Sequence, residues 1–237
     1  LNATQWVQGH KYQRRVFNTC PEDRPLIVQL ASGDYDSIYR SAIDVSRVCD
    51  AVDINLGCTQ HIASRGGYGF FMVETPEKRQ EVIKLFQKLV LNVPVPITAK
   101  IRIFTKTVDE EGNPIPEGND QLKPINVPDV ETTVEFAREL EKVGVSVIAI
   151  HGRFQHRDKK ADVSTEIIKQ VVEALQIPVI ANGGVNSIED AKAILEDTNA
   201  AGVMIGQALI SNPALFDEQP IKRRDFAREY LEIAKEH

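Results

Sequence analysis

Short runs of apolar residues alternate along this chain with longer segments in which apolar residues recur every three to four positions. The short runs are rich in β-branched residues and predict buried strands, whereas the periodic segments predict helices that bury one face. The predicted strands span residues 26–30, 51–56, 97–103, 145–150, 177–181 and 201–205. The predicted helices span residues 38–48, 77–91, 130–143, 165–175, 188–196 and 226–235, with Asp129 as the N-cap of the third.

Six strand-then-helix units follow from this pattern. Strict alternation requires parallel strands joined by right-handed crossovers, as in a doubly wound sheet or a (β/α)8 barrel. The candidate ligand site described below favours the α/β barrel of the TIM (β/α)8 type, which needs eight such units. We therefore expect a barrel that is incomplete at its N-terminus, with two units absent before Leu1 and a helix or loop ahead of the first predicted strand.

One segment interrupts the alternation. Residues 105–128 are polar and rich in proline and glycine, and they show neither a helix nor a strand period. The segment is too long for an ordinary connection, so we interpret it as an insertion. It is either a lid that contacts substrate or an excursion without a role. We assign residues 1–219 to the barrel domain and residues 220–237 to a C-terminal helix.

Composition narrows the class of protein. The chain has 237 residues, 42% of them hydrophobic, and no apolar run long enough to cross a bilayer, so we expect one sizeable soluble domain. Its three cysteines are odd in number and lack C-x-x-C spacing, which argues against a disulfide framework and a zinc site. A reducing compartment, the cytoplasm or the nucleus, is expected. The net charge of −6 argues mildly against a surface coated with nucleic-acid-binding residues but leaves room for a local basic face.

The strongest candidate for chemistry is Cys58, which ends the segment Asn55-Leu56-Gly57-Cys58 directly after a predicted strand. In parallel α/β proteins, the C-terminal ends of strands are where active sites assemble. The glycine-rich segment Gly66-Gly67-Tyr68-Gly69 follows closely and can bring backbone near a flat ligand. From these residues alone, a reactive thiol and a half-buried structural cysteine are equally good interpretations.

Two glycine turns follow the last two predicted strands, at Asn182-Gly183-Gly184 and at Gly206-Gln207. In barrels, the last two strand-to-helix connections commonly cradle a phosphate, because glycines let backbone N–H groups and a helix N-terminus face the anion. Either turn alone is also ordinary turn chemistry. The ordered pair favours a phosphorylated ligand.

Polar residues also stand at the ends of three other predicted strands: Gln29, Lys100, Arg102, His151 and Arg153. Each has a structural interpretation, such as a lysine that extends to solvent or a histidine that satisfies a buried carbonyl. Converging at one rim with Asn55 and Cys58, they can hold an aromatic, anionic cofactor beside a thiol. Two alternatives stay open: a phosphate-sugar lyase or aldolase with Lys100 as the Schiff-base amine, and a catalytically silent RNA-binding remnant.

The order of the motifs carries a specific resemblance. Along the chain they are Val52-Asp53-Ile54-Asn55-Leu56-Gly57-Cys58, Gly66-Gly67-Tyr68-Gly69, Lys100-Ile101-Arg102, His151-Gly152-Arg153, Ala181-Asn182-Gly183-Gly184 and Gly206-Gln207-Ala208. This series resembles the tRNA-dihydrouridine synthases. The segments Cys20-Pro21-Glu22-Asp23-Arg24-Pro25 and Asn212-Pro213-Ala214-Leu215-Phe216 are most similar to the eukaryotic branch that acts on D-loop positions 16 and 17. The resemblance implies an FMN-binding barrel, a smaller helical domain for tRNA that would begin near Pro220, and NADPH or NADH as reductant.

The resemblance also implies roles for individual residues. Cys58 would donate a proton to C5 of a uracil, because a thiol is protonated near neutrality yet can give up its proton. The residues expected to contact the flavin or its phosphate are Gln29, Asn55, Lys100, His151, Asn182, Gly183, Gly184, Gly206 and Gln207. Asn55, Arg102 and Arg153 are expected to orient substrate. Thr59 departs from the proline usual after the cysteine, and because the first strands are absent we expect this chain alone to bind FMN weakly.

For tRNA, the candidate contacts are three basic clusters. They are Lys11, Arg14 and Arg15; then Arg157, Lys159 and Lys160; and then Lys222, Arg223 and Arg224. Such side chains bind phosphates without reading sequence, and most clusters of this kind are merely solvated surface. The cluster from Arg157 to Lys160 is the best candidate because it lies on the predicted catalytic rim. The oligomeric state is left open.

Overall fold

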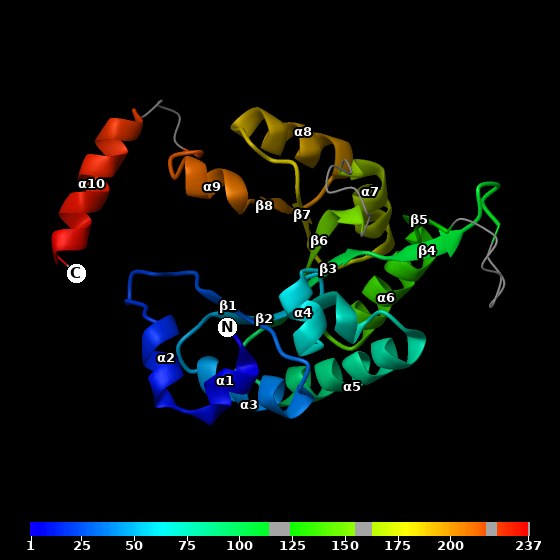
Figure 1. Ribbon diagram of the computed structural model, residues 1–237, viewed down its shortest axis with the longest axis horizontal. Helices are drawn as coiled ribbons and strands as arrows, with labels where there is room; N and C mark the ends of the chain where they lie inside the picture. Colours follow the sequence, from blue (N-terminus) through cyan, green and yellow to red (C-terminus); the bar gives the residue numbers. More distant parts are fainter. Residues whose placement is uncertain (114–123, 155–162, 217–221, 237) are drawn as a thin grey trace.

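The computed structural model describes residues 1–113, 124–154, 163–216 and 222–236. Its centre is one parallel sheet of six strands in the order β1-β2-β3-β6-β7-β8. The strands are β1 (Ile27–Leu30), β2 (Ala51–Asn55), β3 (Ile97–Ile103), β6 (Val147–Phe154), β7 (Val179–Asn182) and β8 (Gly202–Met204). The sheet curls into a half-barrel, and the predicted six units in an α/β barrel arrangement are confirmed (Figure 1).

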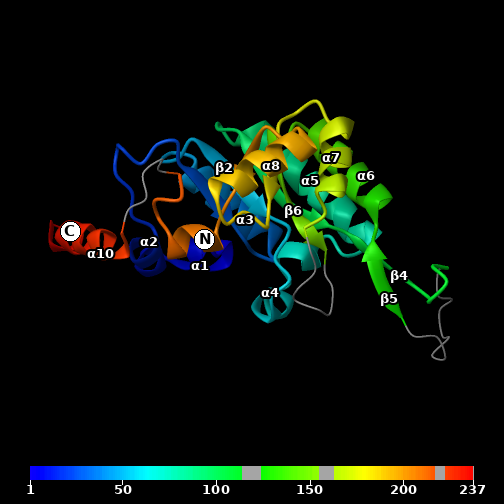
Figure 2. The ribbon, with the colours of Figure 1, turned by 90° about the horizontal axis from the view of Figure 1, so that it is seen from above.

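Helices that follow the strands cover the outer side of the curled sheet (Figures 1 and 2). They are α3 (Tyr35–Val45), α5 (Pro76–Asn92), α6 (Val130–Lys142), α7 (Thr165–Ala174) and α8 (Ile188–Thr198), with the short α4 (His61–Gly66) and a 3-10 turn (Gly69–Met72) between β2 and α5. Each long helix begins at a side-chain cap, and Asp129 accepts from the backbone N–H of Thr132 as predicted. Fully buried Phe86 and Phe136 from the helices belong to the same core as Ile101 of β3, so the apolar side of the sheet faces the helices.

The N-terminal residues lie along the free edge of β1. The residues before β1 form α1 (Ala3–Gln8) and α2 (His10–Val16), in agreement with the expected helix or loop. Ahead of α1, Asn2 makes a parallel bridge with Ala31. The N-terminal ammonium of Leu1 donates to the carbonyl of Gln29 at 2.6 Å, and the carbonyl of Leu1 accepts from Ala31 at 2.9 Å. This edge of the sheet is therefore paired only over its last residues.

The segment between residues 105 and 128 differs from the expectation that it lacks strand structure. Its two ends form β4 (Thr105–Val108) and β5 (Ile125–Pro128), which pair antiparallel in a ribbon that projects beyond the end of β3 (Figure 2). The sequence Thr-Lys-Thr-Val does alternate, but with solvent on most sides it lacks the apolar face that makes a strand recognisable. Its role as an insertion or lid stays a prediction.

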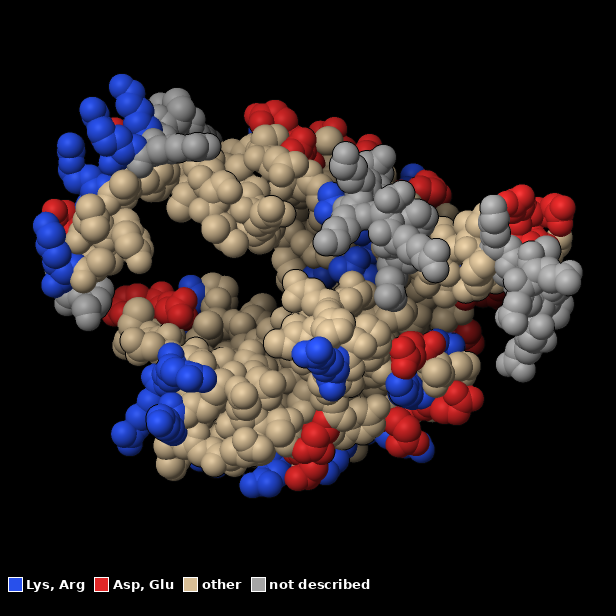
Figure 3. All heavy atoms as spheres, in the orientation of Figure 1, with Lys and Arg blue, Asp and Glu red and all other residues tan. Residues whose placement is uncertain are grey.

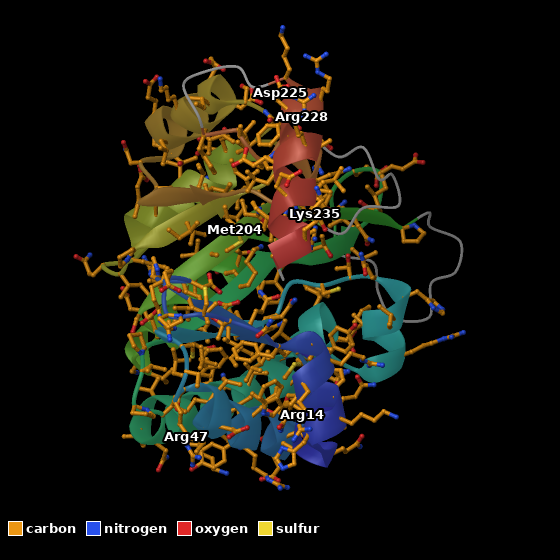
Figure 4. All side chains as sticks on the ribbon, turned by 90° about the vertical axis from the view of Figure 1, so that its left-hand side faces the viewer. Arg14, Arg47, Met204, Asp225, Arg228 and Lys235 are labelled. Carbon is orange, nitrogen blue, oxygen red and sulfur yellow. The ribbon has the colours of Figure 1, made fainter. Side chains whose placement is uncertain are left out.

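The C-terminal residues form α9 (Gln207–Ser211) directly after β8 and, further on, α10 (Arg223–Glu236). Figure 1 shows α10 across the open side of the half-barrel from the sheet, and α10 makes few contacts with the other described elements. Viewed from that side, Asp225, Arg228 and Lys235 lie along α10, and Met204 lies on the edge strand β8 (Figure 4). The apolar side chains of Tyr230, Leu231 and Ile233 on α10 are exposed. Among the described residues, no helix combines the length and apolar character that a bilayer span requires.

Candidate active site

Three rows of side chains cross the concave face of the sheet. In β3, the buried apolar residues alternate with Thr98, Lys100 and Arg102, and residues two apart on a strand share a face. Because the apolar positions face the helices, these polar residues face the hollow that Figure 3 shows open to solvent. The strand register extends each of them into a row: Gln29, Asp53 and Thr98; Asn55, Lys100 and Ala149; and Arg102, His151, Asn182 and Met204.

The backbone around Cys58 is held by four hydrogen bonds. The side-chain oxygen of Asn55 accepts from the N–H groups of Gly57 and Cys58 at 3.1 and 3.2 Å. The Nε of Arg102 donates to the carbonyl of Gly57 at 2.8 Å, and the N–H of Phe70 donates to the carbonyl of Cys58 at 3.0 Å. The backbone of Gly57 and Cys58 is thus held in place, and Cys58 is a free cysteine of intermediate burial. Its assignment as a reactive thiol, against a structural cysteine, stays a prediction.

The predicted glycine-rich segment after Cys58 packs against it. Gly69 has a φ of +69°, and a Cβ there would lie 2.7 Å from the carbonyl oxygen of Cys58. Any side chain at this position would push the cysteine away, so glycine is required both for its backbone conformation and for the close approach. The sequence predicted that this segment approaches a ligand, and the structure brings it against the backbone of the candidate catalytic residue.

Cationic and imidazole groups gather beside this loop. Lys100 is only 9% exposed. Burial, and then the charge of Arg102, lower the pKa of its ammonium to about 8, while Asp53 acts to raise it. None of the described carboxylates lies within 4.0 Å of that ammonium. Arg102 also donates from Nη1 to the carbonyl of Arg153 at 3.0 Å, which ties β3 to β6.

His151 lies in the same group and is neutral at physiological pH. Burial, followed by the charges of Arg102, Lys100 and Arg153, lowers the pKa of His151 to about 3. Its Nδ1 accepts from the backbone N–H of Arg153 at 3.2 Å. This partner assigns the proton to Nε2, which makes His151 a neutral donor toward the hollow.

The two predicted glycine turns differ in how they relate to this group. Gly183 and Gly184 have φ values of +113° and +77°, and a Cβ on Gly183 would lie 3.1 Å from the ring of His151. Asn182 donates to the carbonyl of Met204 at 2.7 Å, which joins the ends of β7 and β8.

At the second turn, a Cβ on Gly206 would meet only open space. Gln207 is exposed at the start of the five-residue helix α9. In the part of the chain that the structure describes, neither residue makes a hydrogen bond to the other predicted site residues.

Other predicted contacts lie elsewhere. Arg157, Lys159 and Lys160 lie outside the described residues. Lys11, Arg14 and Arg15 are exposed on α2, where Figure 4 marks Arg14, and Lys222 and Arg224 are exposed at the start of α10. Their role in binding tRNA, like that of Arg223, stays a prediction.

Sequence reasoning missed the two buried polar residues of the first row. Asp53 and Thr98 are each 6% exposed and hydrogen-bond to each other at 2.6 Å. The signal was present in the alternation of polar residues along each strand, Asp53 with Asn55 and Thr98 with Lys100, since residues two apart share a face. The described residues contain no group of His, Cys, Asp and Glu side chains arranged to hold a metal ion.

Known proteins are similar to this chain over its whole length. The chain is 34% identical over 241 residues to a mouse protein named tRNA-dihydrouridine(16/17) synthase NAD(P)(+)-like, covering 100% of this chain and 45% of the relative. A Schizosaccharomyces pombe tRNA-dihydrouridine(16/17) synthase is 30% identical over 97% of this chain and 54% of its own length. The chain therefore spans about half the length of the curated relatives it matches.

Solved structures add the fold. An old yellow enzyme homologue from Zymomonas mobilis superposes with a TM-score of 0.51 at 12% identity, covering 79% of this chain and 52% of the other. An N-acetylneuraminate lyase from Mycoplasma synoviae gives 0.50 at 16% identity, covering 78% and 53%. Both likenesses concern the barrel architecture alone. The dihydrouridine synthase (Dus) family matches residues 1–115 and 124–237. The chain thus belongs to the dihydrouridine synthase family.

Proposed function

We propose that this chain is the catalytic portion of an FMN-dependent enzyme that reduces uridine to 5,6-dihydrouridine in the D-loop of tRNA, with NADPH or NADH as reductant. Membership of the dihydrouridine synthase family supports the reaction class. The names of the mouse and S. pombe relatives support positions 16 and 17 and a nicotinamide reductant. The observation that carries the proposal is the half-exposed thiol of Cys58 on a backbone held by four hydrogen bonds.

The residues of the hollow fit a phosphorylated flavin. Lys100 is a buried ammonium without a carboxylate within 4.0 Å among the described residues, so it suits a ligand edge that carries negative charge. Gly183 and Gly184 expose backbone beside the neutral donor His151, as a phosphate requires. In this proposal Gln29, Asn55 and Lys100 hold the ring system, and the phosphate end is held by His151, Asn182, Gly183, Gly184, Gly206 and Gln207. When bound and reduced, FMN supplies a hydride to C6 of the uracil.

Cys58 supplies the proton that completes the reduction at C5. The S–H bond breaks, a C–H bond forms at C5, and the thiolate that remains takes up a proton from water. Since the Nε and Nη1 of Arg102 already donate to backbone carbonyls, Arg102 holds the loop, and the exposed Arg153 is the better candidate for orienting substrate.

The tRNA would present an unstacked uridine to the hollow, because a base inside a stack cannot be reached. Basic clusters on α2 and α10 flank the open side of the half-barrel and would contact phosphates. The cluster from Arg157 to Lys160 belongs to this proposal on its sequence position alone.

The test is a reduction assay with two cysteine variants. We would incubate unmodified tRNA with FMN, NADPH and either this chain or a chimera that places before Leu1 the segment preceding the matched region of the mouse relative. Dihydrouridine is measured by mass spectrometry. We expect the product with wild-type protein and with Cys20→Ala, whose cysteine is exposed and remote in sequence, and a loss of at least a hundredfold with Cys58→Ala. Undiminished activity of Cys58→Ala would refute the role of proton donor.

The same proteins discriminate the alternatives. Borohydride trapping of a carbonyl substrate on Lys100 would identify a lyase or aldolase. A tRNA gel shift without any dihydrouridine from either protein would identify an RNA-binding role without catalysis. The likeness to a lyase structure concerns the fold alone and favours neither.

A further inference from the structure

We propose that Asp53 is a positioning residue that anchors the amide of Gln29, and through it the amide of Asn55, and thereby supports the backbone of Cys58. The proposal rests on the function proposed above, in which Cys58 donates a proton. Asp53 lies at the middle of β2 and is 6% exposed. It touches neither the thiol nor its loop, so its influence would pass through the two amides.

The direction of the hydrogen bonds is set at the Cys58 end. The N–H groups of Gly57 and Cys58 are donors, so Asn55 must turn its carbonyl oxygen toward them. Its Nδ2 then faces away and donates to Oε1 of Gln29 at 3.0 Å. This places Nε2 of Gln29 toward Asp53, where it donates to Oδ2 at 2.8 Å. The chain of bonds therefore ends on a donor, Nε2 of Gln29, and is complete only with an acceptor at the position of Asp53.

Asp53 is that acceptor in either protonation state. Its other oxygen, Oδ1, accepts from the hydroxyl of Thr98 at 2.6 Å. The pKa of Asp53 is raised by burial, which outweighs the opposing effects of the bonds from Thr98 and Gln29 and of the charge of Lys100. If the carboxyl takes up a proton, the hydroxyl of Thr98 can accept from it, and the oxygen that faces Gln29 remains an acceptor.

Without the acceptor, Nε2 of Gln29 is left as a part-buried donor without its protein partner. The side chain of Gln29 would then move toward solvent, and its Oε1 would no longer accept from Nδ2 of Asn55. Asn55 would keep its orientation, because the N–H groups of Gly57 and Cys58 still require its oxygen, but it would lose the bond that anchors it to β1, and the two loop bonds would weaken. The expected result is a mobile cysteine backbone in a protein whose core is otherwise intact.

The experiment uses the chain itself and compares four substitutions. Asp53→Leu keeps the size of the side chain but removes the acceptor. Asp53→Asn keeps one acceptor oxygen, provided that the hydroxyl of Thr98 accepts from the new amide. Thr98→Val alone leaves the carboxylate in place, whereas Gln29→Leu keeps Asp53 but removes the amide that links it to Asn55. Thr198→Val, another buried threonine, which bonds only within α8 and its C-terminal end, is the matched control.

Two readouts do not depend on a bound cofactor. Hydrogen exchange at Gly57 and Cys58 reports the two loop bonds, with the amides of α5 as an internal reference. Alkylation of Cys58 by iodoacetamide, relative to the exposed Cys20 in the same molecule, reports the position of the thiol. Both are measured beside the thermal midpoint, and the kcat and KM of dihydrouridine formation are measured in the chimera.

We expect Asp53→Leu and Gln29→Leu to speed exchange at Gly57 and Cys58 at least tenfold and to change the alkylation ratio at least threefold. Exchange in α5 should stay unchanged, and in Asp53→Leu kcat should fall at least tenfold with KM within twofold. Asp53→Asn, Thr98→Val and Thr198→Val should each stay within threefold of wild type. Unchanged exchange and alkylation in Gln29→Leu would overturn the proposal, even if Asp53→Leu fails to fold. Altered exchange and alkylation without any dihydrouridine from wild type would leave the positioning role intact and count against the proposed function.

Discussion

A methyl group at Gly69 should displace Cys58, and the size of this effect can be worked from the structure. A Cβ there would lie 2.7 Å from the carbonyl oxygen of Cys58, where ordinary contact begins at 3.4 Å, so the two must separate by about 0.7 Å. The bond from the N–H of Phe70 to that carbonyl would be lost, at about 1 kcal/mol. Because a misplacement of about 1 Å can cost roughly a hundredfold in rate, we expect kcat to fall at least tenfold.

Gly67→Ala is the matched control for Gly69→Ala. Gly67 has a φ of +62°, close to the +69° of Gly69, but a Cβ on it would meet nothing within 4 Å. Both substitutions should lose about 1–2 kcal/mol of unfolding free energy from the left-handed conformation. Only Gly69→Ala should lose about 1 kcal/mol more and change the alkylation rate of Cys58. Urea unfolding and iodoacetamide labelling measure these two quantities, and equal behaviour of the two variants would refute the reasoning.

Three further predictions concern the cationic group. The pKa of Lys100 falls from 10.5 to about 8 on folding, so the unfolded chain binds more protons between these two pH values. The free energy of unfolding should therefore rise with pH across that window by up to about 3 kcal/mol relative to Lys100→Met, as measured by urea unfolding. If the difference in unfolding free energy between the two proteins did not change with pH, the buried position of the ammonium would be contradicted. The ring of His151, whose pKa is lowered to about 3, should show no titration between pH 5 and pH 8 by NMR, with His151→Ala used for assignment. Arg102→Lys keeps the charge but loses the forked donation to the carbonyls of Gly57 and Arg153, so the alkylation ratio of Cys58 should change at least threefold; an unchanged ratio would show that the loop does not depend on this fork.

The strands of the sheet could be predicted from the sequence because each buries apolar residues against the helices, which gives a recognisable pattern. Alternation along Ile97–Ile103 set both the strand and the face that carries Lys100 and Arg102, and the structure agrees. Motif order placed Asn55 at the end of β2 and Cys58 directly after it, and the two bonds that the Asn55 side chain accepts explain why an asparagine occurs there. Local pattern was sufficient for these features because each depends on contacts within a strand or with its direct neighbour.

What the sequence did not predict depends on contacts between distant segments. The role of Arg102 as a clamp needs the carbonyls of Gly57 and Arg153, which come from the loop after β2 and from β6. The link from Asp53 to Gln29 needs the register of β1 against β2, which no residue pattern specifies. The ribbon of β4 and β5 is short and mostly exposed, so it lacks the hydrophobic period on which strand prediction relies.

The four bonds on the peptide groups of Gly57 and Cys58 leave the sulfur a single torsion. Rotation about Cα–Cβ has three staggered positions, so Sγ can occupy only three points around a stationary Cα. A substrate atom that misses all three points gains nothing from loop adjustment. In the proposed reaction, discrimination between one pyrimidine and another would therefore depend on how the nucleotide is bound in the hollow, because the position of the sulfur does not adjust to it.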